Sequence, residues 1–246
     1  MNRILAGDDV VAYEALPSGP QAPRSPAILL LSAIAGVNDY MTDMARRLAL
    51  RGYRVLLLDY FGREGRPPDV STPEAIGRAV AALSDTRVLA DIRVLLEYLR
   101  AQAGVDASRI GTLGFCIGGT YSLLAACENP GLAAAVVYYG AIRYPAITSC
   151  KPSSPLERVA ALQAPLLAHF GNCDRLIPAT DVAAFEEALQ RHAKAYELCV
   201  YRGAPHAFDE HFRPAVYRPV ASSLAWERSM VFLDWHLSST LRGTSQ

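Results

Sequence analysis

The chain has 246 residues, of which 51% are apolar and 20% are charged, and its 24 basic side chains balance 24 acidic ones. This length and composition are typical of one globular domain, residues 1–246, with a large core. The zero net charge, without a basic stripe, argues against nucleic acid or an anionic membrane as a partner. No run is apolar and long enough for a signal peptide or a membrane span, so we expect a cytoplasmic protein.

Apolar, strand-like runs alternate with helical segments along the chain. In chain order, we predict strands at 27–31, 54–59, 110–113, 134–139, 165–170 and 198–201, with an antiparallel edge strand at 10–15. The predicted helices are 38–50, 85–103, one that begins at Ile117, 182–191 and a last long helix. Continuous apolar strands between helices indicate an α/β fold with a mostly parallel sheet buried on both faces. The segment between 139 and 165 is too short for a lid domain, which favours an open cleft for a small substrate.

The most informative segment is Gly114-Phe115-Cys116-Ile117-Gly118-Gly119, between a strand-like run and a helix-forming stretch. Gly-x-Cys-x-Gly is the sulfur form of the nucleophile elbow, a strained turn from a strand into a helix. Glycines are needed because a Cβ at Gly114 or Gly118 would collide with the neighbouring element. The alternative interpretation is a buried cysteine in a tight turn.

A thiol at this turn lies at the N-terminus of the helix that begins at Ile117. The positive end of the helix dipole favours thiolate over thiol. The backbone N–H of Ile117 has no partner within the helix and can donate to an oxyanion. The turn therefore predicts a nucleophile and half of an oxyanion hole.

The five cysteines are odd in number, scattered and without C-x-x-C spacing, so neither a disulfide framework nor a zinc site is implied. They are Cys116, Cys127, Cys150, Cys173 and Cys199.

A base for the thiol must come from a histidine later in the chain, after an acid. His206 lies in the loop Gly203-Ala204-Pro205-His206, between the last strand-like run and the last helix, where such a base belongs. His211 is a rival nearby in sequence. Of the others, we expect His169 in the core or at a sheet edge, and His192 and His236 at the surface.

Asp174 is the predicted acid because it follows the strand 165–170, within Gly171-Asn172-Cys173-Asp174. The alternative is a turn residue or the neighbour of a helix cap. Asp209 is too close to His206 in sequence to orient its ring easily.

The chain resembles the dienelactone hydrolases, or carboxymethylenebutenolidases, which are small α/β-hydrolases without a lid. The resemblance spans about residues 26 to 237. It is carried by Ile34-Ala35-Gly36-Val37-Asn38, Gly52-Tyr53, Asp59, Asp91, Tyr98, Arg100, the 114–119 segment, Tyr138-Tyr139-Gly140, Gly171-Asn172-Cys173-Asp174 and Gly203-Ala204-Pro205-His206. It implies an α/β-hydrolase fold with a mostly parallel central sheet, helices on both faces and no lid domain.

The resemblance also implies roles for individual residues. Cys116 would be the nucleophile, His206 the base and Asp174 the residue that orients its ring. The backbone N–H groups of Ile34 and Ile117 would form the oxyanion hole. Tyr138 would line the pocket, its alternative role being a buried aromatic of the sheet. No metal or organic cofactor is implied, and the partner is a small-molecule substrate of a monomer or homodimer.

Two departures from the family concern the pocket. The family has a glutamate, where this chain has Ala33, that holds the resting thiol away from the histidine. Without it, we expect Cys116 to lie against His206 as a thiolate–imidazolium pair.

The second departure is the loss of two arginines that hold the lactone's carboxylate in the family. Glu210 stands in one place, and the other falls near Pro73, with Arg78 as the nearest cation. A carboxylate without guanidinium partners is poorly bound, so we expect a neutral or cationic ester, thioester or lactone. Glu210 would contact a positive or hydroxyl group, or be a solvated loop residue.

The expected activity is hydrolysis of a small ester, thioester or lactone through an acyl-enzyme. Two alternatives stay open at this point. One is a lyase, cyclase or isomerase acting on a small carbonyl compound in the same pocket. The other is a non-catalytic binding protein on a hydrolase fold.

Overall fold

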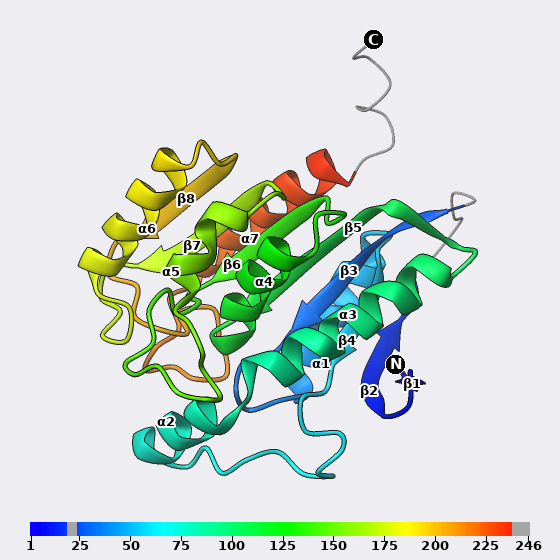
Figure 1. Ribbon diagram of the computed structural model, residues 1–246, viewed down its shortest axis with the longest axis horizontal. Helices are drawn as coiled ribbons and strands as arrows, with labels where there is room; N and C mark the ends of the chain where they lie inside the picture. Colours follow the sequence, from blue (N-terminus) through cyan, green and yellow to red (C-terminus); the bar gives the residue numbers. More distant parts are fainter. Residues whose placement is uncertain (19–23, 238–246) are drawn as a thin grey trace.

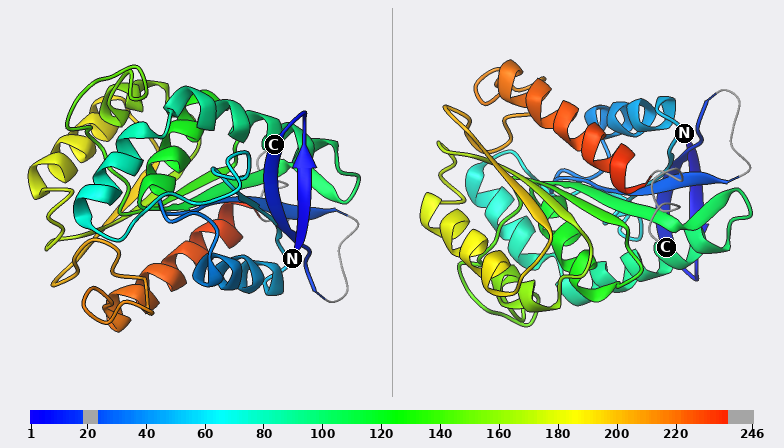
Figure 2. Two further views of the ribbon diagram at one scale, coloured as in Figure 1. Left: turned by 90° about the horizontal axis from the view of Figure 1, so that it is seen from below. Right: turned by 90° about the horizontal axis from the view of Figure 1, so that it is seen from above.

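The computed structural model describes residues 1–18 and 24–237 and is built around an eight-stranded sheet. Helices α1 and α7 cover one face of the sheet, and α3, α4 and α6 cover the other (Figures 1 and 2). The strands are β1 (Asn2–Ala6), β2 (Val10–Ala15), β3 (Ser25–Leu31), β4 (Arg54–Leu58), β5 (Val105–Phe115), β6 (Ala134–Tyr138), β7 (Leu166–Gly171) and β8 (Tyr196–Tyr201). The helices are α1 (Asp39–Leu50), α2 (Pro73–Ala82), α3 (Asp85–Ala101), α4 (Ile117–Glu128), α5 (Pro155–Arg158), α6 (Ala179–Arg191) and α7 (Pro219–His236), with a 3₁₀ turn at Val159–Ala161.

The predicted α/β fold with a mostly parallel sheet is confirmed. The strand order is β1-β2-β4-β3-β5-β6-β7-β8. The pairs from β4 to β8 are parallel, and β2 pairs antiparallel with β4, as expected for an edge strand. Strand β1, which pairs with β2, was not expected, and neither was α2. Helix α2 buries only Ala75, so it contributes little to the core.

The carboxyl ends of the parallel strands meet at one edge of the sheet, and the candidate site residues follow these ends. Cys116 follows β5, Asp174 lies three residues beyond β7, and His206 lies in the loop after β8. Residues far apart in sequence are thereby brought to one edge, where α/β folds bind their ligands.

A buried ion pair holds the segment that follows β6. The Lys151 Nζ lies 2.6 Å from Asp85 Oδ1, at the start of α3, and burial lowers the pKa of Lys151. The Tyr121 hydroxyl of α4 donates to the same carboxylate at 3.0 Å, and the ammonium lies 5.0 Å from the Tyr144 ring centroid. These contacts tie the connection between β6 and α5 to two helices on one face of the sheet.

The crossing of β5 and α4 depends on glycine at position 114. A Cβ on Gly114 would lie 2.0 Å from the Gly118 carbonyl oxygen, a backbone atom that cannot move aside. We therefore expect Gly114→Ala to reduce the free energy of unfolding by about 3 kcal/mol or more, measured by urea denaturation.

The control is Gly77→Ala in α2, where an added Cβ meets nothing within 4 Å. Alanine is the better helix former there, by about 0.5–1 kcal/mol, so this variant should be as stable as the native protein or more so. Equal stability of Gly114→Ala and the native protein would contradict the steric argument.

Candidate active site

Cys116 lies on the sharp turn that the sequence pattern predicts. Its backbone has φ 55° and ψ −122°, a left-handed conformation that side chains rarely adopt. The turn is held because the Cys116 N–H donates to the Tyr138 carbonyl at 3.0 Å. A Cβ on Gly118 would lie 2.2 Å from the carbonyl oxygen of Leu31, so β3 also approaches the turn closely. The elbow is therefore enforced by steric contacts with two neighbouring strands and its own helix.

The structure brings Cys116, His206 and Asp174 together in one hydrogen-bonded chain. His206 Nε2 lies 3.2 Å from Cys116 Sγ, and His206 Nδ1 lies 2.8 Å from Asp174 Oδ2. The other carboxylate oxygen, Oδ1, accepts from the backbone N–H groups of Leu176 and Ile177 at 2.8 and 3.1 Å. With both oxygens engaged, the carboxylate has a defined orientation toward the ring.

The electrostatics of this chain favour an imidazolium. Burial by itself disfavours the charged ring, but the negative charge of Cys116 and the hydrogen bond that the ring donates to Asp174 outweigh it and raise the pKa of His206 to about 10. Ala33 is half-buried at the position where the family has a glutamate, and its methyl group offers no polar partner to the thiol. The thiol of Cys116 therefore lies beside His206.

The other histidines have different surroundings. His169 is fully buried between Tyr201 and Ser229, with both hydroxyls 3.0 Å from its ring nitrogens, and burial lowers its pKa to about 3. His211 and His192 are exposed, and the half-buried His236 ring packs on Phe232. In the described ranges, the hydrogen bond from a histidine to Cys116 comes from His206 alone.

The two expected oxyanion donors lie on either side of the thiol. Ile117 is the first residue of α4, and Ile34 follows β3. Neither backbone N–H donates a backbone hydrogen bond within residues 1–18 and 24–237. Both amides are therefore available to a group bound beside Cys116.

Tyr138 has the surroundings of a buried aromatic of the sheet, which was the alternative to a place in the pocket. Its side chain is fully buried on the α7 side of the sheet, where the hydroxyl lies 2.8 Å from Ser229 Oγ and the ring packs on His169. Tyr139, the residue that follows β6, has a positive φ of 40° and lies closer to the site. Its ring centroid lies 5.1 Å from that of His206. Because Tyr139 lies beyond the end of β6, period-two alternation along the strand could not have identified it.

Glu210 is not a solvated loop residue. It is only 7% exposed, and its Oε2 accepts from Arg213 Nη1 at 2.8 Å. Glu210 stands where the family has an arginine, so Arg213 is a cation next to that position. The sequence pattern did not point to Arg213. Arg78 is exposed on α2 and has Asp69 as a charged neighbour.

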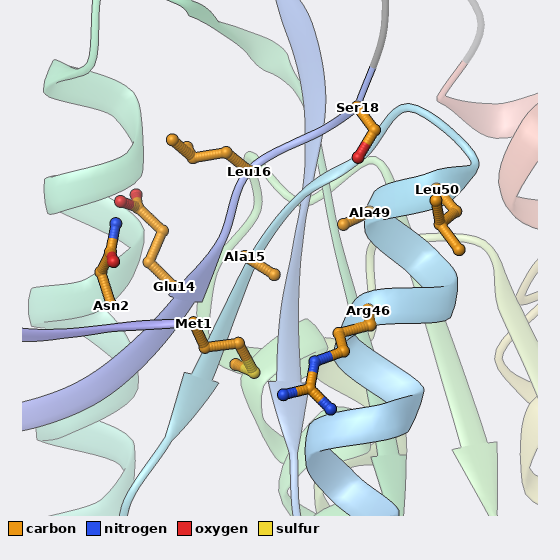
Figure 3. A pocket seen from close by; sticks show the side chains of 9 residues that line it. All are labelled: Met1, Asn2, Glu14, Ala15, Leu16, Ser18, Arg46, Ala49 and Leu50. Atoms are coloured by element: carbon orange, nitrogen blue, oxygen red, sulfur yellow. The ribbon is translucent and has the colours of Figure 1, made fainter.

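A surface hollow of about 400 Å³ lies elsewhere on the molecule (Figure 3). It is lined by residues of the antiparallel edge and by Arg46, Ala49 and Leu50 in the last turns of α1. Because β4 begins directly after α1, this hollow lies toward the amino ends of the parallel strands, at the edge opposite to Cys116.

Two further findings concern the part of the chain that the structure describes. It contains no group of three or more His, Cys, Asp or Glu side chains arranged to hold a metal ion. None of its helices has the length and apolar character needed to cross a membrane.

Comparison with known proteins adds independent information. The model of the dienelactone hydrolase family matches residues 11–237. A probable 2-oxo-3-(5-oxofuran-2-ylidene)propanoate lactonase from Bradyrhizobium sp. is 45% identical over 231 residues, which cover 94% of this chain and 91% of that protein. A putative carboxymethylenebutenolidase from Escherichia coli (strain K12) is 34% identical over 230 residues, covering 93% and 82%.

Among solved structures, the putative dienelactone hydrolase from Klebsiella pneumoniae subsp. pneumoniae MGH 78578 superposes with a TM-score of 0.86. It is 30% identical, and the match covers 94% of this chain and 97% of that one. The fold, the matching family model and these relatives agree: the chain belongs to the dienelactone hydrolase family and is an ester or lactone hydrolase.

Proposed function

We propose that this hydrolase acts through a Cys116-His206-Asp174 triad and a covalent acyl-enzyme. The observation that carries the proposal is the continuous contact from Sγ to Nε2 at 3.2 Å and from Nδ1 to the carboxylate at 2.8 Å, on a strained elbow. A nucleophile, a base and a group that orients the base are what acyl transfer by covalent catalysis requires.

The proposed reaction begins with attack of the Cys116 thiolate on the substrate carbonyl carbon. The N–H groups of Ile34 and Ile117 stabilise the negative charge that develops on the carbonyl oxygen. His206, already protonated, gives its proton to the leaving oxygen as the ester bond breaks and the thioester remains. The ring then takes a proton from water, the hydroxide attacks the thioester, and the thiolate is released. In a lactone, the leaving oxygen stays attached to the acyl chain, so the ring opens.

The substrate class is a small ester, thioester or lactone. The Bradyrhizobium relative is named for a lactone that carries a propanoate group, which favours lactones among these. Glu210, however, places a buried carboxylate where the family has an arginine, and its partner Arg213 is engaged by it. This pairing favours a substrate group that is neutral or cationic at that end of the site, because an anion would face Glu210.

The first prediction concerns the acyl-enzyme. With p-nitrophenyl acetate, the native protein should release a burst of p-nitrophenol and gain the mass of one acetyl group. Cys116→Ala should lose both, because the thiol that attacks the ester and carries the acetyl group is gone. Stopped-flow absorbance and intact-protein mass spectrometry measure the two signals.

Cys127→Ala, at a buried cysteine of α4, is the matched control and should retain the burst. Turnover without a burst or an adduct would contradict the acyl-enzyme and favour lyase-type chemistry in the same pocket.

The second prediction concerns the protonation of His206, whose pKa is raised to about 10. The native ring should stay charged through neutral pH and lose its proton only as the pH approaches about 10. In Cys116→Ala the largest favourable influence on the charge is gone while burial remains, so the titration midpoint should move to lower pH. Nuclear magnetic resonance of labelled imidazole groups measures it, with the neutral His169 as an internal reference.

The third prediction concerns Glu210. Glu210→Gln removes a negative charge and releases the guanidinium of Arg213, so KM for a carboxylate-bearing lactone should fall about two- to fivefold. KM for the methyl ester of the same lactone should not change. An equal effect on both substrates would show that Glu210 does not discriminate charge.

A further inference from the structure

The histidine of the proposed triad lies on a long loop with a strained backbone. Residues 202–218, between β8 and α7, contain no helix or strand, and His206 lies within them. Ala207, directly after the histidine, has a positive φ of 60°, a conformation that alanine rarely adopts. A residue in such a conformation persists only where its surroundings hold it. The loop therefore depends on contacts that hold His206 at the thiol.

Asp209, three residues beyond His206, makes contacts of this kind. It is only 5% exposed, and burial raises the pKa of its carboxyl, so the side chain is held in the interior at a cost. The Tyr40 hydroxyl on α1 donates to Oδ2, and Ser222 Oγ on α7 donates to Oδ1 at 2.6 Å. The carboxylate thus fastens the loop to the two helices that cover this face of the sheet (Figure 2).

Tyr40 connects this fastening to the nucleophile. It is the second residue of α1, and its ring centroid lies 5.9 Å from that of Phe115, with the two rings edge to face. Phe115 is the last residue of β5 and directly precedes Cys116. One side chain therefore touches the strand that leads to the thiol with its ring and the loop that carries His206 with its hydroxyl.

Other contacts of the loop act at different points. Asp174 lies 2.8 Å from Nδ1 of His206, and the Tyr139 ring packs on the imidazole, so both act on the ring itself. The backbone N–H of Arg218 donates to the Phe208 carbonyl at 2.9 Å and closes the loop on itself. The Asp209 carboxylate is the contact that ties the loop to α1.

We propose that Asp209 and Tyr40 are positioning residues whose hydrogen bond fixes the loop after β8 against α1 and so sets the distance between His206 Nε2 and Cys116 Sγ. Ser222 holds the second carboxylate oxygen from α7. The two residues act on the reaction through His206 and not on the substrate. A displacement of about 1 Å at such a contact lowers a rate by up to about 100-fold. The inference rests on the proposed triad.

The test compares Tyr40→Phe with Tyr53→Phe. Tyr53 is also buried, and its hydroxyl donates to Asp234 of α7 at 2.5 Å, so the control loses a similar bond that does not involve the His206 loop. The burst of p-nitrophenol from p-nitrophenyl acetate is followed by stopped-flow absorbance over a range of substrate concentrations. Urea denaturation of each variant measures the loss of stability.

In Tyr40→Phe the acylation rate constant at saturating substrate should fall about tenfold, because the base is no longer held at the thiol. The substrate concentration that half-saturates the burst should stay the same, because the hydroxyl does not contact the substrate. Tyr53→Phe should change neither quantity, although it loses comparable stability. A native-like acylation rate constant in Tyr40→Phe, or an equal fall in Tyr53→Phe, would overturn the proposal.

Two further variants test the same carboxylate. Ser222→Ala removes its second donor and should lower the acylation rate constant by a smaller factor. It also decides the matter if Tyr40→Phe does not fold, since an unchanged rate constant in Ser222→Ala then counts against the proposal. The double variant Tyr40→Phe/Asp209→Asn should be no slower than the slower single variant, because both changes act on one hydrogen bond. Losses that multiply would contradict a shared route.

The experiment separates this inference from the proposed function. A native protein that gives neither a burst nor an acetyl adduct would overturn the triad and, with it, the positioning role. A native burst together with native-like acylation in Tyr40→Phe would overturn only the role of Tyr40 and Asp209.

Discussion

The site depends on one steric constraint, the close approach of three backbones around Gly114 and Gly118. Strand β5 and helix α4 meet where a Cβ on Gly114 would lie 2.0 Å from a carbonyl oxygen, and β3 meets the same turn at Gly118. This crossing forces Cys116 into a left-handed backbone conformation and lifts its side chain above the sheet edge. Strands β3 and β5 and helix α4 therefore fix the position of the thiol. The loops after β7 and β8 bring Asp174 and His206 to it.

The charges around the thiol follow from this placement. The elbow leaves Cys116 half-buried beside His206, and burial of a single charge would be unfavourable. The arrangement offsets this cost by pairing: Cys116 Sγ contacts the His206 ring, the ring contacts Asp174, and two backbone N–H groups donate to the carboxylate.

The pocket departs from the family at positions that set its charge. Ala33 removes a carboxylate from the neighbourhood of the thiol, and Glu210 adds one on the loop after β8, where Arg213 pairs with it. The thiol lies beside His206, and under the proposed function Glu210 would change which substrate groups the site accepts.

The sequence by itself determined the features that depend on local chemistry. The elbow follows from glycine sterics over six residues, the strands and helices follow from apolar periodicity, and the order Cys116, Asp174, His206 follows from where the strands end. Tertiary structure alone decided that the Tyr139 ring packs against His206 while the Tyr138 hydroxyl lies beside Ser229, and that Glu210 is buried against Arg213. The physical reason is that a side chain's facing and partners depend on packing between segments distant in sequence, where a shift of one residue along a strand reverses the face.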